Sequence, residues 1–268
     1  MKTTDTLHVL LSDMHTGSNK ALFLASHWQS KKTGVNHSPT NEQIGIRKQW
    51  DKFTQETAKA RKGKKVRLVM DGDAIDGVHH GGFDLCSSDP LEHADIHIQL
   101  MAQFQKSIGW QRGDELYYVK GTEVHVNDWE NYVGDELNAV SVSDFLRLDT
   151  NGVVSWFVHH GKGAGMGDSE GNAIRNWLKA IRNEAMKDNT ETPDIIYTGH
   201  VHQPTYSTYT YRNSMQFRNM HGIVLPSWQL KTRYAWKVAP VSKNRIGGVL
   251  HEIKADGTIT VPQFSVMG

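Results

Sequence analysis

Short apolar runs alternate with amphipathic stretches over the first three quarters of the chain. Five such runs have the length of buried strands, at residues 7–11, 66–70, 116–119, 153–158 and 194–197. Between them, apolar residues recur at helical spacing in residues 41–62, 90–108 and 171–186. The faces of the first two predicted helices carry Ile46, Trp50, Phe53 and Thr57, and Leu91, Ala94, Ile98, Met101 and Ile108. Alternating strands and helices predict an α/β fold.

From Tyr206 onward the apolar pattern changes to period two, which is typical of strands. Asp256-Gly257 is a hairpin signal within this region. Residues 17–40 are polar and predict a long loop, and no repeat or Pro/Gly-rich linker divides the chain. We therefore expect one domain over residues 1–268, with at least one mixed sheet.

The overall charge argues against a general polyanion binder. The chain has 30 Lys and Arg against 29 Asp and Glu, so no strong attraction of the whole molecule to nucleic acid or an acidic membrane is expected. The densest basic stretch, residues 61–65, is interpreted as a solvated turn. Cys86 is the single cysteine, which excludes an intramolecular disulfide and a cysteine zinc cage.

The remaining composition predicts a cytoplasmic protein. No apolar run reaches the ~18 residues of a membrane span. The first residues, Met1 to Thr6, show no cleavable signal pattern.

Acids and histidines follow three of the predicted strands directly. They stand in Asp13-x-His15, Gly72-Asp73-x-x-Asp76 and Gly199-His200-x-His202. Strand ends converge on one crevice in α/β folds, and the alternation of a strand turns residues two apart to one side. Carboxylates mixed with imidazoles suit Mn, Fe, Zn, Co or Ni better than Mg or Ca. Two such ions about 3.5–4 Å apart would activate a bridging hydroxide and hold a phosphoryl group.

With Gly121…His125 and His160-Gly161 added in order, the set resembles the calcineurin-like metallophosphoesterase superfamily over positions 13–202. The resemblance implies a four-layer αββα sandwich, with two mixed β-sheets packed face to face and helices outside. The compact chain with long loops is similar to phage and bacterial members.

The resemblance also implies roles for individual residues. One metal would be held by Asp13, His15, Asp73 and His202, and the other by Asp73, a residue of the third motif, His160 and His200. Asp76 would hold its loop in place, with a turn-capping role as the alternative. His125 would orient the phosphate or protonate the leaving group. The cofactors would be two divalent transition-metal ions, Mn first, with Fe, Zn, Ni or Co as alternatives.

The third motif departs from the family pattern Gly-Asn-His. Thr122 stands at the Asn position, but a neutral hydroxyl is a poor metal ligand, so we favour Glu123 as the replacement, followed by a one-residue offset before His125. In the fourth motif His159 competes with His160, which is preferred because it directly precedes a glycine.

Other candidates have plainer interpretations. His93 and His97 have a zinc-type spacing but no evident third ligand, so a solvated helix flank is favoured. His80 is either a substrate contact at the crevice rim or part of a flexible loop. The glycine-rich residues 161–167 lack the ending of a phosphate-binding loop. Trp228, Tyr234 and Trp236 are interpreted as core or sheet-face aromatics, with a stacking platform for a base as the alternative.

The sequence thus predicts a dinuclear metal-dependent phosphoesterase acting on phosphomonoesters or phosphodiesters. The near-neutral charge disfavours a processive nuclease on long duplex DNA and favours a nucleotide, a cyclic phosphodiester or a nucleic-acid end as substrate. The rival hypothesis is a non-catalytic metal-binding or scaffold descendant, favoured only by the altered third motif. A structural zinc protein is disfavoured because of the many acids.

Overall fold

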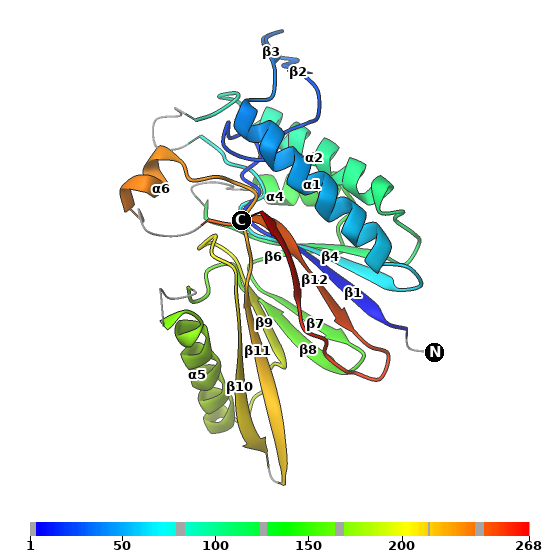
Figure 1. Ribbon diagram of the computed structural model, residues 1–268, viewed down its shortest axis with the longest axis vertical. Helices are drawn as coiled ribbons and strands as arrows, with labels where there is room; N and C mark the ends of the chain where they lie inside the picture. The colour runs from blue at the N-terminus through cyan, green and yellow to red at the C-terminus, as the bar shows by residue number, and fades with distance from the viewer. Residues whose placement is uncertain are drawn as a thin grey trace.

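Two mixed β-sheets packed face to face form the centre of the molecule, with helices outside both (Figure 1). The computed structural model describes residues 4–78, 84–123, 128–163, 169–213, 215–238 and 244–267. Among the described residues, three helices cover the larger sheet and one covers the smaller. The expected four-layer αββα sandwich is therefore confirmed.

The larger sheet brings three predicted strand ends to one edge. Its order is β13 (Gln263–Met267), β12 (Ile246–Ile253), β1 (Thr6–Leu11), β4 (Lys65–Asp71), β5 (Glu115–Val119) and β6 (Ser141–Ser143). Strands β1, β4, β5 and β6 are parallel, whereas β12 is antiparallel to β1. The loops after β1, β4 and β5 consequently leave the sheet side by side.

The smaller sheet brings the remaining predicted motifs together. Its order is β10 (Thr205–Asn213), β11 (Gln216–Val224), β9 (Ile195–Thr198), β8 (Val153–Phe157) and β7 (Leu146–Thr150). Parallel pairing of β8 with β9 places the histidines that follow each strand at one edge. A small hairpin of β2 (Trp28–Gln29) and β3 (Asn36–His37) lies in the predicted loop.

Five helices are described, and the first two begin at side-chain caps. They are α1 (Asn41–Ala60), α2 (Pro90–Ser107), α4 (Trp129–Glu136), α5 (Asn172–Asp188) and α6 (Arg233–Val238). Thr40 and Gln43 form a capping box at α1, and Asp89 caps α2 just before its first-turn proline. Figure 1 shows α1 and α2 on the outer side of the larger sheet and α5 against β10 and β11. Among the described residues, no helix is long and apolar enough to cross a membrane.

The packing confirms most of the predicted apolar faces. Ile46, Trp50, Phe53 and Thr57 of α1 are all buried, and the Trp50 ring contacts Trp228 with centroids 4.8 Å apart. Buried Trp228 confirms the core interpretation for that residue. Leu91 was expected on the buried stripe of α2 but is 42% exposed, because it lies in the first helical turn, outside the packed face.

Two interpretations from the sequence are wrong, and a third, the solvated turn at residues 61–65, fails only at Arg61. His93 and His97 are fully buried, not solvated. His97 lies between the Thr16 hydroxyl and the Tyr118 hydroxyl, at 3.1 and 2.9 Å, so hydrogen bonds replace water around its ring. Trp236 is 59% exposed and is not a core residue. Arg61 in the basic turn is buried and pairs with Asp114 at 3.1 Å.

Candidate metal centre

The first two motifs are joined by continuation of the β1–β4 pairing. The Asp13 amide donates to the Gly72 carbonyl at 3.0 Å, and the His15 amide donates to the Asp73 carbonyl at 2.8 Å. On its other side, Asp13 accepts a hydrogen bond from the Trp228 amide at 3.0 Å. These backbone bonds fix the positions of Asp13, His15 and Asp73 before any side chain contributes.

Two buried carboxylates lie at the centre of the site. Asp13 Oδ1 is 3.1 Å from His202 Nε2 and 4.0 Å from His15 Nε2. Asp73 Oδ2 is 3.2 Å from His159 Nε2 and 3.8 Å from His15 Nε2. The ligand atoms fall into three groups within 4.8 Å of one another, namely Asp13-His15-His202, Asp13-Asp73-His159 and His159-His160-His200.

The structure therefore brings six of the sequence-predicted ligands into one cluster: Asp13, His15, Asp73, His160, His200 and His202. Their role as metal ligands remains a prediction. His80 and His125 lie outside the described residues, so their predicted roles stay untested.

Backbone strain is concentrated in this cluster. Eight described non-glycine residues have positive φ. Three are asparagines, which tolerate that conformation, and the other five are Asp13, His15, Asp73, His200 and His202, with φ between 42° and 69°. Each such residue costs on the order of 1–3 kcal/mol, and strain of this kind is typical of functional sites.

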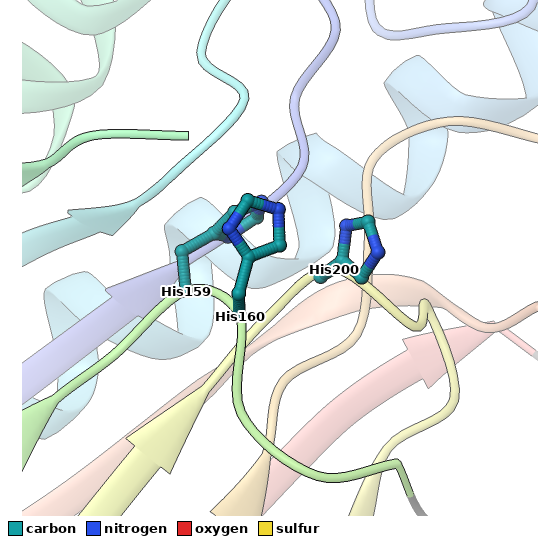
Figure 2. A group of neighbouring side chains, drawn as sticks. All are labelled: His159, His160 and His200. Carbon is teal, nitrogen blue, oxygen red and sulfur yellow. The ribbon is translucent and has the colours of Figure 1, made fainter. Parts of the chain in front are cut away.

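His159 is placed more deeply than the sequence suggested. Its Nδ1 lies 2.7 Å from the Asp71 carbonyl, which can only accept, so Nδ1 carries a proton and Nε2 is the ring atom that faces the carboxylates. That Nε2 is buried without a hydrogen-bond partner in the described part of the chain. His160 and His200 are exposed beside it, with ring centroids 4.5 Å apart (Figure 2). The preferred His160 thus shares the site with the competing His159.

The third motif also differs from expectation. The Thr122 amide donates to Asp73 Oδ1 at 2.7 Å, and its hydroxyl lies 3.0 Å from His160 Nε2. Glu123, favoured as the ligand from the sequence, is exposed, and none of the three ligand groups among the described residues contains it. Its role stays a prediction, and Thr122 is the residue of this motif that contacts the cluster.

Close packing explains the glycines of the motifs. A Cβ at Gly121 would lie 2.2 Å from the Asp73 amide nitrogen, and one at Gly72 would lie 2.2 Å from the His159 ring. Both distances are far below van der Waals contact, so a side chain at either position would displace a predicted ligand.

Hydrogen bonds orient the groups around the carboxylates. Asp76 Oδ1 lies 3.0 Å from His15 Nδ1, which leaves His15 Nε2 directed at the centre. Ser12 Oγ lies within hydrogen-bond distance of Asp13 Oδ2 and of the Asp71 carbonyl, and its one proton can be donated to either. The buried Glu130 carboxylate accepts from the Ala74 amide at 3.1 Å and the Gly121 amide at 2.8 Å.

The charges of the centre are strongly coupled. Burial opposes protonation of His15, but the Asp76 hydrogen bond and neighbouring carboxylates outweigh it and raise its pKa to about 9. Burial likewise opposes protonation of His159, yet Asp13 and Asp73 raise its pKa to about 10. Burial and the charge of His159 lower the pKa of His200. The buried carboxylates of Asp13 and Asp73 thus favour positive charge on His15 and His159 beside them. Divalent metal ions would supply the same positive charge.

Sequence patterns missed several residues of the site. Ser12, Asp71 and Glu130 are buried there, and burial raises the pKa of the Asp71 carboxyl to about 7. Ser12 and Asp71 adjoin motif residues, a signal that could have identified them. Glu130 lies on α4, which the apolar pattern did not predict, so nothing in the sequence pointed to it.

Comparison with known proteins finds only remote structural likenesses. No protein-family model and no curated protein matches the chain. Among solved structures it is similar to zinc-complexed Vps29 from Entamoeba histolytica, with 11% identity over 97% of this chain and 99% of that one and a TM-score of 0.38. A novel archaeal phosphodiesterase has 9% sequence identity over 96% of this chain and 99% of that one, with a TM-score of 0.40. A predicted phosphoesterase from Streptococcus pneumoniae has 9% sequence identity over 99% of this chain and 99% of that one, with a TM-score of 0.33. Such remote likenesses carry no chemistry, which has to be inferred from this chain's own residues.

Proposed function

We propose that this chain is a dinuclear metal-dependent phosphoesterase of the calcineurin-like superfamily, acting on phosphomonoesters or phosphodiesters. The observation that carries the proposal is the place of Asp73. Its carboxylate lies between the Asp13-His15-His202 group and the His159-His160-His200 group, where one carboxylate can serve two ions.

The donor set fits two divalent transition-metal ions. The first would be held by Asp13, His15, Asp73 and His202. The second ion would be held by Asp73, His200 and the buried Nε2 of His159. On the outer side, its ligands would be His160 and either Thr122 or Glu123. The position of His159 Nε2, 3.2 Å from Asp73 and 3.9 Å from Asp13, supports this set. A bound ion would replace the proton on Nε2, while the Asp71 carbonyl keeps the proton on Nδ1 and so fixes the tautomer that binds metal. Manganese, or Fe, Zn, Ni or Co, suits such mixed N/O ligands.

The protein's own groups would position the ester and its proton. When bound, the ions would supply Lewis-acid polarisation of the phosphoryl oxygens and of water. The strained backbone at Asp13 and Asp73 holds the ligands in place before substrate arrives. The exposed His160 and His200 stand at the open side, where a neutral imidazole can contact a phosphate oxygen or a leaving group.

We also propose that residues 1–268 form one domain in the cytoplasm. Strands of both sheets share one inter-sheet core that includes Leu10, Val69, Phe157 and Val249, and one core supports one folding unit.

The deciding experiment measures metal content and hydrolysis together. Purified protein loaded with Mn, Ni, Co or Zn is assayed on p-nitrophenyl phosphate and bis-p-nitrophenyl phosphate, beside Asp73→Asn. We expect close to two ions per chain, turnover of at least one ester, and loss of both in Asp73→Asn. Metal binding without turnover would favour the non-catalytic alternative, which the altered third motif supports.

A second pair of variants assigns the third motif. If Glu123 is a ligand, Glu123→Ala lowers metal affinity while Thr122→Val does not. If Thr122 is the ligand, the two results are reversed. Isothermal titration calorimetry with Mn²⁺ measures both without reference to activity.

A further inference from the structure

The acids of this chain are absent from the region that follows its fifth predicted strand. Between Asp194 and Glu252 there is no Asp or Glu, while the same stretch has seven basic residues: Arg212, Arg218, Lys231, Arg233, Lys237, Lys243 and Arg245. The whole chain carries a formal charge of only +1. A near-neutral total therefore conceals a strongly basic segment, which includes the last metal motif.

Part of this segment borders the metal centre. The connection between β11 and β12 starts at the centre, where the Trp228 amide donates to the Asp13 carbonyl at 3.0 Å. It returns there through the Arg245 amide, which donates to the His202 carbonyl at 3.1 Å, and through Asn244 Nδ2, 3.2 Å from His202 Nδ1. Helix α6 lies between these two attachments and stands out at one side of the molecule (Figure 1).

Helix α6 combines an exposed tryptophan with exposed cations. Trp236 is 59% exposed and is the one exposed tryptophan of the described residues. Lys231 Nζ lies 4.4 Å from the centroid of its ring. Arg233 and Lys237 are exposed, and neither forms an ion pair with another described residue. An exposed ring close to exposed cations such as Arg233 and Lys237 is the arrangement that single-stranded nucleic acids bind, through base stacking and backbone charge.

We propose that α6 and its flanking residues bind single-stranded nucleic acid and lead a phosphodiester into the metal centre. A base stacks on Trp236, and Arg233 and Lys237 contact neighbouring phosphates. The inference rests on the proposed phosphoesterase function and names its substrate class. A duplex fits less well because its bases are already stacked on one another, and a protein partner would need a larger apolar patch than a single exposed indole.

Binding can be measured apart from catalysis. A fluorescein-labelled DNA single strand of about 12 nucleotides, within the span such sites cover, is titrated into metal-free Asp73→Asn protein and followed by fluorescence anisotropy. The test variants are Trp236→Ala and the double variant Arg233→Gln/Lys237→Gln. The matched control is Lys62→Gln/Arg112→Gln, which removes two exposed cations that line a separate cavity beside the start of β4.

We expect Trp236→Ala to weaken binding at least about fivefold, the lower end of the range for losing one stacked base. The double variant should weaken it and make the slope of log affinity against log salt shallower by about 1.4, at about 0.7 for each phosphate contact with a single strand. The control should retain both the affinity and the slope.

Three results would overturn the inference: no binding, equal binding of a duplex of the same length, or equal losses in the control variant. Failure of the inference and failure of the proposed phosphoesterase function give different results. A protein that hydrolyses bis-p-nitrophenyl phosphate without binding the strand refutes only the inference. A protein that binds the strand but hydrolyses neither ester refutes only the phosphoesterase.

Discussion

Glu130 links two of the loops that carry predicted metal ligands. One carboxylate oxygen accepts from the Ala74 amide, next to Asp73, and the other accepts from the Gly121 amide. The side chain is fully buried. We predict that Glu130→Gln weakens metal binding about 10- to 100-fold, the usual effect of removing a group that orients ligands from behind.

The effect on stability should be much smaller than the effect on metal affinity. The oxygen of a glutamine can still accept from one of the two backbone amides, Ala74 or Gly121, but its NH₂ group would face the other. A buried backbone N–H without a partner costs about 1–3 kcal/mol. Against this, burial raises the pKa of Glu130 from 4.5 to about 7, which corresponds to a cost of about 3 kcal/mol for the charged carboxylate that glutamine avoids. The two contributions nearly cancel, so we expect the free energy of unfolding to change by less than about 2 kcal/mol.

The assay is calorimetric titration of the metal-free protein with Mn²⁺, combined with urea unfolding at the same pH. Glu115→Gln is the matched control. Glu115 is at the opposite end of β5, where its carboxylate contacts Lys65 and Arg67 Nε, the latter at 2.8 Å. Unchanged metal affinity in Glu130→Gln, or an equal loss in Glu115→Gln, would refute the idea that Glu130 acts by positioning the two loops.

Four further outcomes are expected. Gly121→Ala should lower both stability and metal affinity, because its Cβ would lie 2.2 Å from the Asp73 amide nitrogen, an overpacking of about 1–3 kcal/mol; urea unfolding and calorimetry measure the two losses. Asp76→Asn should weaken Mn²⁺ binding about tenfold, since His15 loses its partner carboxylate at 3.0 Å; calorimetry would contradict this by showing no change. Burial lowers the pKa of His97 to about 3, so this ring is neutral when folded but takes a proton when unfolded below about pH 6.5; wild type should lose about 2 kcal/mol between pH 6.5 and 5 from this residue, and the stability difference from His97→Gln should shrink by that amount. Mn²⁺ at a hundred times its dissociation constant should stabilise the protein by about 2.7 kcal/mol, and a chelator should reverse the gain in melting temperature.

The sequence was sufficient for the five strands that precede the motifs, the long helices and the cluster, because each of these has a local signal, whereas β2, β3, β6 and β7 were not predicted. The apolar run at residues 7–11 ends at Asp13, and the strand that forms, β1, ends at Leu11. Helix α1 begins at Asn41, directly after the capping box of Thr40. Glycine next to Asp73 and His200 marked the close contacts that the backbone makes there.

Sequence patterns failed where tertiary contacts decide. Histidines on α2 look polar in any one-dimensional pattern, but Gly17 leaves space for His93, and Thr16 with Tyr118 satisfies His97. The choice between His159 and His160 depends on which ring turns inward, and the contact with the Asp71 carbonyl settles the orientation of His159. Neither fact can be read from spacing.

Net charge is a weak guide to binding partners, because it averages over regions of the molecule that face different surroundings. Of the chain's acids, Asp13, Asp71, Asp73, Asp76 and Glu130 are buried at the centre, where metal or histidine would neutralise them and little of their field reaches solvent. Arg233 and Lys237, by contrast, lie exposed on α6. An approaching polyanion would therefore meet cations whose balancing acids lie inside the protein. The same near-zero total that argues against a general polyanion binder is compatible with a local basic surface on α6.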